Sequence, residues 1–387
     1  MSNNYCYIAS AGAGKTTFIV KDSYKRALLT TKKIGIVTFT SNNQNTEKQK
    51  YIDIHKKIPT NVKIIGWYSF LLDYFIRPFK GDVIERLYDI HVSQAFINPP
   101  IFKQNGHKLP HYQKGDLKSK YLTTDNNIYK DYLSEFALEC LQKNSNTLLN
   151  RLQQIFDTIY FDESQDFGGF DLDIIKSILK NTSIDCIITT DPRQHTYSSC
   201  NLIKHKKYNG RIDLFCSERI NQKRKTFIII DNTKFIYSHR CNADICRFAS
   251  QIHPEFPETT PCKCDQCIEK KSHYTKEQGV YLVNESNTQL FINQYNATIL
   301  TYNKDVKTNA IGQRFNFGEC KGDEFNGVLI YPTKDILTWL KKSNTLSPTT
   351  KSKFYVALTR AIFIVGIVVP NNFIHSRFNL QYWSPSL

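Results

Sequence analysis

The stretch that decides the fold is YIASAGAGKTTF, Tyr7 to Phe18, close to the first residue. The apolar residues that open it predict a short β-strand, and the apolar spacing of the residues that come after it predicts a helix. Glycines between a strand and a helix let backbone N–H groups converge on an anion at the positive end of the helix. The stretch therefore predicts a phosphate-binding loop, with a chance glycine turn as the alternative.

The residues that would surround the phosphates of a bound nucleotide are consecutive. Lys15 would reach the β- and γ-phosphates, and the hydroxyl of Thr16 would be a ligand of Mg²⁺. The first glycine of the usual pattern is replaced by Ala9. The predicted nucleotide-binding residues of the loop are Ala11, Gly12, Ala13, Gly14, Lys15, Thr16 and Thr17.

A second acidic element is expected to hold the metal, and TIYFDESQDF supplies one. Its apolar part predicts a buried strand, which is followed directly by Asp162 and Glu163. One carboxylate at the end of such a strand can hold Mg²⁺, and its neighbour can orient or deprotonate the attacking water. The alternative is a solvated acidic loop.

Composition sets the class of protein. The 387 residues are enough for two or three domains, and the formal net charge of +16 favours a polyanionic partner such as nucleic acid. The longest apolar run, 362–369, is too short to span a bilayer, and the first residues do not have the pattern of a cleavable signal. The eleven cysteines are scattered, which favours a reducing compartment. We therefore expect a cytoplasmic protein without a membrane partner.

Further motifs occur in order along the chain, and together they resemble those of superfamily 1A DNA helicases of the UvrD/Rep/PcrA type. The most diagnostic pair is DESQD (162–166) with VALTRA (356–361). The full set is ASAGAGKTT (9–17), TFTSNNQNT (38–46), GWYSF (66–70), DESQD (162–166), TDPRQHTY (190–197), YSHRCNADIC (237–246), CKGDEF (320–325) and YVALTRA (355–361).

The resemblance implies a role for each matched residue. For catalysis it implies Glu163 as the base, Gln194 as the sensor of the γ-phosphate, and Arg240 and Arg360 as arginine fingers. Glu324 would contact the ribose, and Asp162 with Thr16 would hold Mg²⁺. The implied DNA-binding residues are Thr40, Trp67, Tyr68 and Tyr197.

The implied fold is α/β, with two RecA-like parallel-sheet motor domains and a mainly helical insertion in the first. The first motor domain, 1A, would comprise residues 1–70 and 151–224, and the 1B-like insertion would comprise 71–150. The second motor domain, 2A, would comprise 225–387 with a short Cys-rich insertion at 254–275. Strand-like segments alternate with helical ones in both predicted motor domains.

Departures from the family pattern leave two functions open. The 2B subdomain is essentially absent, Ser199 stands where a base-stacking Trp is expected, and no glutamine motif precedes Ala9, so the preference for ATP over other nucleotides stays open. The first function is ATP hydrolysis coupled to movement on single-stranded or tailed DNA, 3′-to-5′ as in relatives, in repair or antiviral defence, and whether duplex is also unwound stays open. The alternative is a regulatory NTPase that senses DNA ends or nucleotide state for a partner nuclease, as in the Gabija antiviral system.

One cluster of cysteines is unexpected for this family. Cys262, Cys264 and Cys267 lie within the segment PCKCDQC and could bind Zn²⁺ if a fourth ligand came from His253, His273 or Cys246. A C-x-C-x₂-C triplet without a second matched pair is a weak metal signature, so free thiols in a loop are the alternative.

Overall fold

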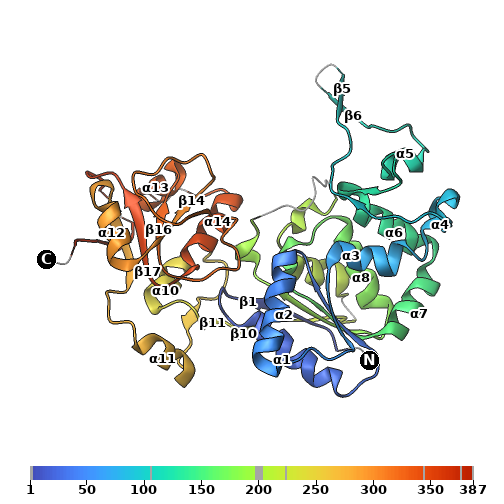
Figure 1. Ribbon diagram of the computed structural model, residues 1–387, viewed down its shortest axis with the longest axis horizontal. Coiled ribbons are helices and arrows are strands. Elements are labelled where there is room, and N and C mark those ends of the chain that lie inside the picture. The colour runs from blue at the N-terminus through green and yellow to red at the C-terminus, as the bar shows by residue number, and fades with distance from the viewer. Residues whose placement is uncertain are drawn as a thin grey trace. The chain divides into compact units, whose positions relative to one another are not determined.

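The computed structural model describes residues 3–104, 107–196, 204–222, 225–342, 345–374 and 377–385. The chain divides into two compact units (Figure 1). The first unit comprises Met1–Tyr7, Thr16–Thr190 and Ser198–Asp231, and the second comprises Ile8–Lys15, Asp191–Tyr197 and Asn232–Leu387.

One sheet has six strands in the order β10-β1-β9-β8-β2-β3. The pairs β2–β3, β2–β8 and β8–β9 are parallel, and their apolar residues are buried as expected for strands covered on both faces. The strands are β1 (Tyr5–Ala9), β2 (Lys33–Thr38), β3 (Val62–Gly66), β8 (Phe156–Phe161), β9 (Asp185–Thr190) and β10 (Ile229–Phe235).

Helices connect these strands, and three of them, α3, α8 and α9, bury apolar residues in one core with residues of the sheet. Helix α2 begins after Thr40, whose side chain accepts a hydrogen bond from the N–H of Asn43, the ordinary way to satisfy the first turn of a helix. The helices are α1 (Lys15–Ala27), α2 (Ser41–His55), α3 (Trp67–Leu71), α8 (Phe170–Asn181) and α9 (Ile212–Phe215), with a π-helical turn at Cys216–Ile220.

The segment between α3 and β8 combines helices with short strands. The apolar side chains that its helices α6 and α7 bury pack in the same core as the sheet. The helices are α4 (Lys80–Val83), α5 (Leu117–Tyr121), α6 (Leu133–Lys143) and α7 (Ser145–Ile155), with a π-helical turn at Leu72–Ile76. The strands are β4 (Gln94–Ala95), β5 (Phe102–Gln104), β6 (His107–Leu109) and β7 (Ile128–Tyr129).

The second unit contains another six-stranded sheet, in the order β15-β14-β16-β17-β13-β18, whose paired strands run parallel. Strand β17, the longest apolar run of the sequence, is buried along its whole length. The strands are β13 (Gly279–Asn284), β14 (Thr298–Thr301), β15 (Arg314–Asn316), β16 (Phe325–Tyr331), β17 (Ala361–Val369) and β18 (Gln381–Tyr382). The helices are α10 (Ala243–Ser250), α11 (Asp265–Ser272), α12 (Thr288–Tyr295), α13 (Lys334–Lys341) and α14 (Pro348–Leu358).

The predicted α/β class with two parallel sheets is confirmed, and the two sheets with their helices agree with two RecA-like units. The domain boundaries drawn from the sequence stay a prediction. Among the described residues, no helix has both the length and the apolar character needed to cross a membrane.

Candidate functional site

The phosphate loop lies between the end of β1 and the start of α1. Gly12 has φ +70° and Gly14 has φ +81°, conformations that side chains of L-residues rarely adopt. A Cβ atom on Gly12 would lie 2.7 Å from the Cβ of Arg240 and 2.9 Å from the Oγ of Ser238. Glycine is therefore required at position 12 for two reasons, the positive backbone angle and the close approach of the 238–240 segment.

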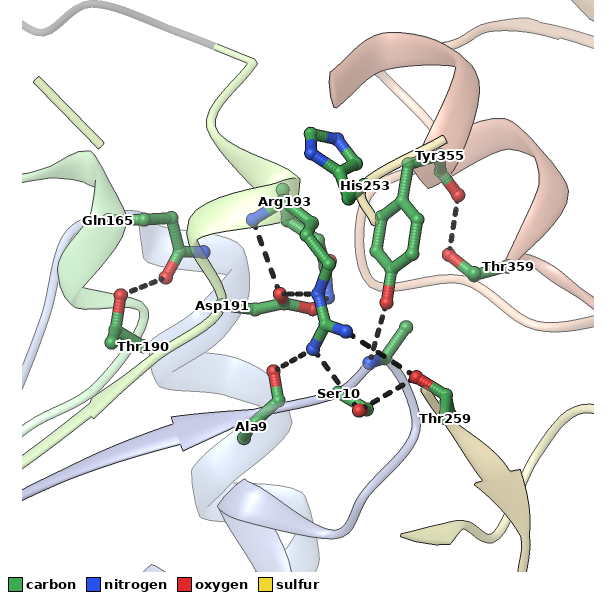
Figure 2. A network of polar contacts seen from close by, with 12 residues as sticks. Ala9, Ser10, Gln165, Thr190, Asp191, Arg193, His253, Thr259, Tyr355 and Thr359 are labelled. Atoms are coloured by element: carbon green, nitrogen blue, oxygen red, sulfur yellow. Dashed lines mark hydrogen bonds and ion pairs between the residues drawn. The ribbon is translucent and has the colours of Figure 1, made fainter. Parts of the chain in front are cut away.

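A buried polar network in the second unit holds the start of this loop (Figure 2). Arg193 donates from Nε to Oδ1 of Asp191 at 2.8 Å, and from Nη2 to the carbonyl oxygen of Ala9 at 2.9 Å and to Oγ of Ser10 at 3.1 Å. Thr259 donates to the same Ser10 hydroxyl at 2.8 Å. Burial acts to lower the pKa of Arg193, but the Asp191 carboxylate outweighs it and raises that pKa above its ordinary value. Arg193 is therefore charged, and its hydrogen bonds hold the start of the loop.

A second anchor comes from α14. The hydroxyl of Tyr355 accepts a hydrogen bond from the backbone N–H of Ala11 at 3.2 Å, and its ring lies 5.3 Å from the guanidinium carbon of Arg193 (Figure 2). Sequence reasoning did not single out Arg193 or Tyr355, although both stand inside the motifs TDPRQHTY and YVALTRA. For Tyr355 a signal exists in the apolar residues of YVALTRA, which favour burial, whereas the polar neighbours of Arg193 give no such signal.

The predicted γ-phosphate sensor, Gln194, and one of the predicted arginine fingers, Arg360, meet in the second unit. Arg360 is buried, and its Nη2 donates to Oε1 of Gln194 at 3.3 Å. The amide nitrogen of Gln194 in turn donates to Oδ2 of Asp191 at 2.7 Å. The carboxylate that orients Arg193 thus also orients Gln194, so the loop anchor and the Arg360–Gln194 contact share one buried acid.

The other predicted arginine finger and the predicted ribose contact form an ion pair. Nη2 of Arg240 lies 2.9 Å from Oε1 of Glu324. Nη1 of Arg240 donates to the carbonyl oxygen of Thr359, also at 2.9 Å. Burial alone would raise the pKa of Glu324, but Arg240 holds it below its usual range. A nucleotide that recruits either side chain therefore competes with its present partner.

The predicted metal and base carboxylates lie in the first unit, directly after β8. Asp162 is buried and accepts a hydrogen bond from the hydroxyl of Thr189, while Glu163 accepts one from the side-chain amide of Gln165. Glu163 has φ +51°, a left-handed conformation that is uncommon outside glycine. Residues with strained backbone conformations are concentrated at functional sites. The conformation of Glu163 therefore agrees with a carboxylate that is held in one position.

The surroundings of Asp162 fit a divalent cation. Glu47 on α2 is buried, and its pKa is raised well above the ordinary value by burial and by the charge of the neighbouring Asp162. Crowded carboxylate oxygens, together with a hydroxyl such as that of Thr16, are hard ligands of the type that Mg²⁺ takes. A cation would also relieve the repulsion among these acids.

The four predicted DNA-binding residues have different surroundings. Thr40 is exposed at the start of α2, and Tyr68 is partly buried against Phe39. Trp67 is fully buried, and its indole N–H donates to Oδ1 of Asp171 at 2.8 Å, so it presents no ring face to a base in this structure. Tyr197 lies outside the described residues.

The Cys-rich segment brings its three cysteines to a histidine that sequence reasoning did not name. The ligand atoms of His239, Cys262, Cys264 and Cys267 all lie within 4.8 Å of one another. The fourth ligand suggested from the sequence was His253, His273 or Cys246, and none of these belongs to the cluster. His253 instead contacts the carboxylate of Glu255 at 3.0 Å.

No protein-family model and no curated protein matches the chain. Solved structures with some likeness include the following helicases. Arterivirus nonstructural protein 10 (helicase) has a TM-score of 0.42 at 16% identity, its complex with DNA 0.43 at 15%, and the PRRSV helicase 0.40 at 14%. The alignments cover 95% of this chain but 60%, 61% and 52% of those chains, respectively. At these scores the likeness carries no argument, and the assignment of a function depends on the residues of the chain itself.

Proposed function

We propose that the chain is a nucleoside triphosphatase of the superfamily 1 helicase type, which couples hydrolysis of ATP to movement on single-stranded DNA. The observation that carries the proposal is the convergence of separate sequence motifs within the second unit. The phosphate loop meets Arg193 of the 190–197 motif, Tyr355 of the last motif and the backbone of the 238–240 segment. A structural glycine turn would not require such partners.

The proposed chemistry assigns each group one task. Loop N–H groups and Lys15 bind the β- and γ-phosphates. The oxygen of the attacking water forms a bond to the γ-phosphorus as the bond to the leaving diphosphate oxygen breaks, and Glu163 accepts a proton of that water. Mg²⁺, held by Thr16 and Asp162, would supply charge neutralisation at the phosphates when bound. Arg240 and Arg360 would stabilise the charge that develops on the γ-oxygens.

Coupling to movement would follow from the present partners of the two arginines. Arg360 contacts Gln194 and Arg240 contacts Glu324, so engaging a γ-phosphate exchanges a protein partner for a phosphate oxygen. Gln194 lies in the 191–197 segment, whose polar side chains also hold the loop. Loss of the γ-phosphate would return both arginines to these partners, which gives the unit two alternative arrangements tied to nucleotide state.

The alternative function, a regulatory NTPase for a partner nuclease with little unwinding, is favoured by one observation. Trp67, a residue that the resemblance assigns to DNA, is fully buried and bonded to Asp171. Together with Ser199 in place of the expected Trp, this reduces the aromatic surface available for stacking bases. Both functions require the same hydrolytic site.

The test is hydrolysis of ATP and GTP with and without single-stranded DNA, together with strand displacement on duplexes with a 3′ or a 5′ tail. We expect hydrolysis stimulated by DNA and displacement from the 3′ tail. Glu163→Gln should abolish turnover and retain nucleotide binding, whereas Glu85→Gln, at an exposed position, should leave turnover unchanged. Hydrolysis without displacement supports the regulatory function, and wild-type turnover in Glu163→Gln contradicts the assigned base.

A further inference from the structure

The cluster of His239, Cys262, Cys264 and Cys267 has the dimensions of a metal site. Its ligand atoms lie within 4.8 Å of one another, and Nδ1 of His239 lies 3.3 Å from Sγ of Cys267. Around a tetrahedral Zn²⁺, with Zn–S near 2.3 Å and Zn–N near 2.0 Å, neighbouring ligand atoms stand about 3.5–3.8 Å apart. The observed spread therefore needs shifts of about 1 Å at most, within the reach of a change in side-chain torsion.

The backbone builds this arrangement from two distant segments. Strand β11 (Tyr237–Ser238) pairs in parallel with β12 (Thr260–Pro261), and the N–H of Cys262 donates to the carbonyl oxygen of Ser238 at 2.8 Å. The next residues along the two strands are His239 and Cys262, so this pairing sets them beside each other. The ligands are thus fixed by main-chain hydrogen bonds, not by chance contact of side chains.

The remaining two ligands come from the start of α11. The N–H of Cys267 donates to the carbonyl oxygen of Cys264 at 2.9 Å, which closes one turn and brings the two thiols to the same side. The spacing of these cysteines, C-x₂-C, is typical of structural zinc sites. The pairing of β11 with β12 supplies Cys262 and His239, and of these two ligands only Cys262 could be named from the sequence.

Helix α11 of the Cys-rich segment buries little apolar surface. Cys267 is the only buried residue of α11, while Ile268 is 56% exposed and Cys264 is exposed. An eight-residue helix without an apolar face does not fold on its own. Small segments that cannot bury enough apolar surface are commonly stabilised by a metal or by disulfides.

We propose that His239, Cys262, Cys264 and Cys267 bind one structural Zn²⁺. Four protein ligands fill a tetrahedral site and leave no position for substrate, so the ion would stabilise the fold and take no part in hydrolysis. The thiols bind as thiolates and release their protons to solvent, and the imidazole binds as the neutral form.

Zinc at this site would fix the segment that carries Arg240. The backbone N–H of His239 donates to the carbonyl oxygen of Gly12 at 2.9 Å, and the ring of His239 lies 3.5 Å from the position of a Cβ on Gly14. A metal ligand therefore contacts the phosphate loop through its main chain and precedes Arg240 by one residue. This consequence depends on the proposed nucleotide site, whereas the binding of zinc does not.

The test measures metal in the full-length chain purified under reducing conditions without chelator. Elemental analysis by mass spectrometry should find about one equivalent of zinc per chain, released on titration of the thiols with an organomercurial. Cys264→Ser, at an exposed position, should lose most of this zinc. The matched control is Cys140→Ala, a buried cysteine of α6 outside the cluster, which should retain it.

A second measurement keeps the proposal testable if Cys264→Ser fails to fold. Wild-type chain exchanged into Co²⁺ should show the thiolate-to-cobalt charge-transfer band and the intense visible bands of a tetrahedral site, and zinc should displace them. Absence of both zinc and this cobalt spectrum in reduced wild-type chain would overturn the proposal. So would equal zinc content in Cys264→Ser and Cys140→Ala, or a disulfide among Cys262, Cys264 and Cys267 in chain prepared with reductant.

Discussion

Arg193 donates from Nη2 to the carbonyl oxygen of Ala9 at 2.9 Å, at the point where strand β1 turns into the phosphate loop. The usual glycine of the loop pattern is absent at position 9, and the backbone there is instead held by an arginine from the 191–197 segment. Arg193 is in turn oriented by Asp191, which also binds Gln194. The geometry of the loop thus depends on a buried ion pair.

Arg193→Met should leave the buried carboxylate of Asp191 without its cation. Breaking a buried pair by removing one partner typically costs about 3–5 kcal/mol, so we expect a loss of this order in the free energy of unfolding. Urea denaturation measures it. Arg247→Met is the matched control, because Arg247 pairs with Asp244 at the surface and such pairs contribute about 0–1 kcal/mol.

Arg193→Lys separates the effect of the positive charge from the effect of the planar guanidinium group and its several hydrogen bonds. Lysine keeps the charge but cannot bind Asp191, Ala9 and Ser10 at once. We therefore expect most of the stability to return while nucleotide affinity, measured with a fluorescent ATP analogue, stays weaker than in the wild type. Wild-type affinity in Arg193→Lys would show that the loop does not need the contacts to Ala9 and Ser10.

Gly12→Ala should lower the free energy of unfolding by more than backbone strain alone explains. Gly12 and Gly115 both have positive φ, but a Cβ on Gly115 would meet nothing within 4 Å, whereas one on Gly12 would lie 2.7 Å from the Cβ of Arg240. Gly115→Ala therefore measures strain alone, about 1–2 kcal/mol. Gly12→Ala should show a larger loss of stability and of nucleotide affinity. Equal effects of the two substitutions would contradict the close approach of the 238–240 segment.

Asp171 should make stability depend on pH. Burial raises the pKa of Asp171 to about 6 from 3.8, although Trp67 and the N–H of Gly168 both donate to it. The folded chain therefore binds this proton more tightly than the unfolded chain. The resulting stabilisation is fully present below the unfolded pKa and is lost as pH rises through about 6, a change of about 3 kcal/mol.

Asp171→Asn should remove this part of the pH dependence. The difference in unfolding free energy between wild type and Asp171→Asn, measured in urea at several pH values from 4 to 7, should fall as pH rises. Asp89→Asn, at an exposed position, should give a difference that stays flat. A flat difference for Asp171→Asn as well would mean that the carboxyl ionises normally in the folded chain.

The sequence predicts the sheets well because parallel buried strands are continuous apolar runs, as in 361–369. It also predicts the phosphate loop, because glycines between a strand and a helix have few other roles. The sequence predicts the role of a residue less well where that role depends on whether the side chain is buried. Trp67 lies in a motif assigned to DNA, but its partner Asp171 is 104 residues away, and nothing local indicates that the ring is buried.

The partners of the loop and of the cysteines were missed for a related reason. His239 joins Cys262 through the pairing of two-residue strands that are far apart in the sequence, and such short strands leave no periodic signal. Arg193 stands among polar residues in its motif, where an exposed arginine is the ordinary expectation. Only the fold reveals that it is buried against Ala9 and Ser10.

The most direct test of the proposed site is an experimental structure of the full chain with Mg²⁺, ADP and aluminium fluoride, a mimic of the transferring phosphoryl group. We expect the β-phosphate on the loop amides and Lys15, with the guanidinium groups of Arg240 and Arg360 on the fluoride ligands and released from Glu324 and Gln194. A nucleotide bound elsewhere, or both arginines still on Glu324 and Gln194 beside a bound analogue, would contradict it.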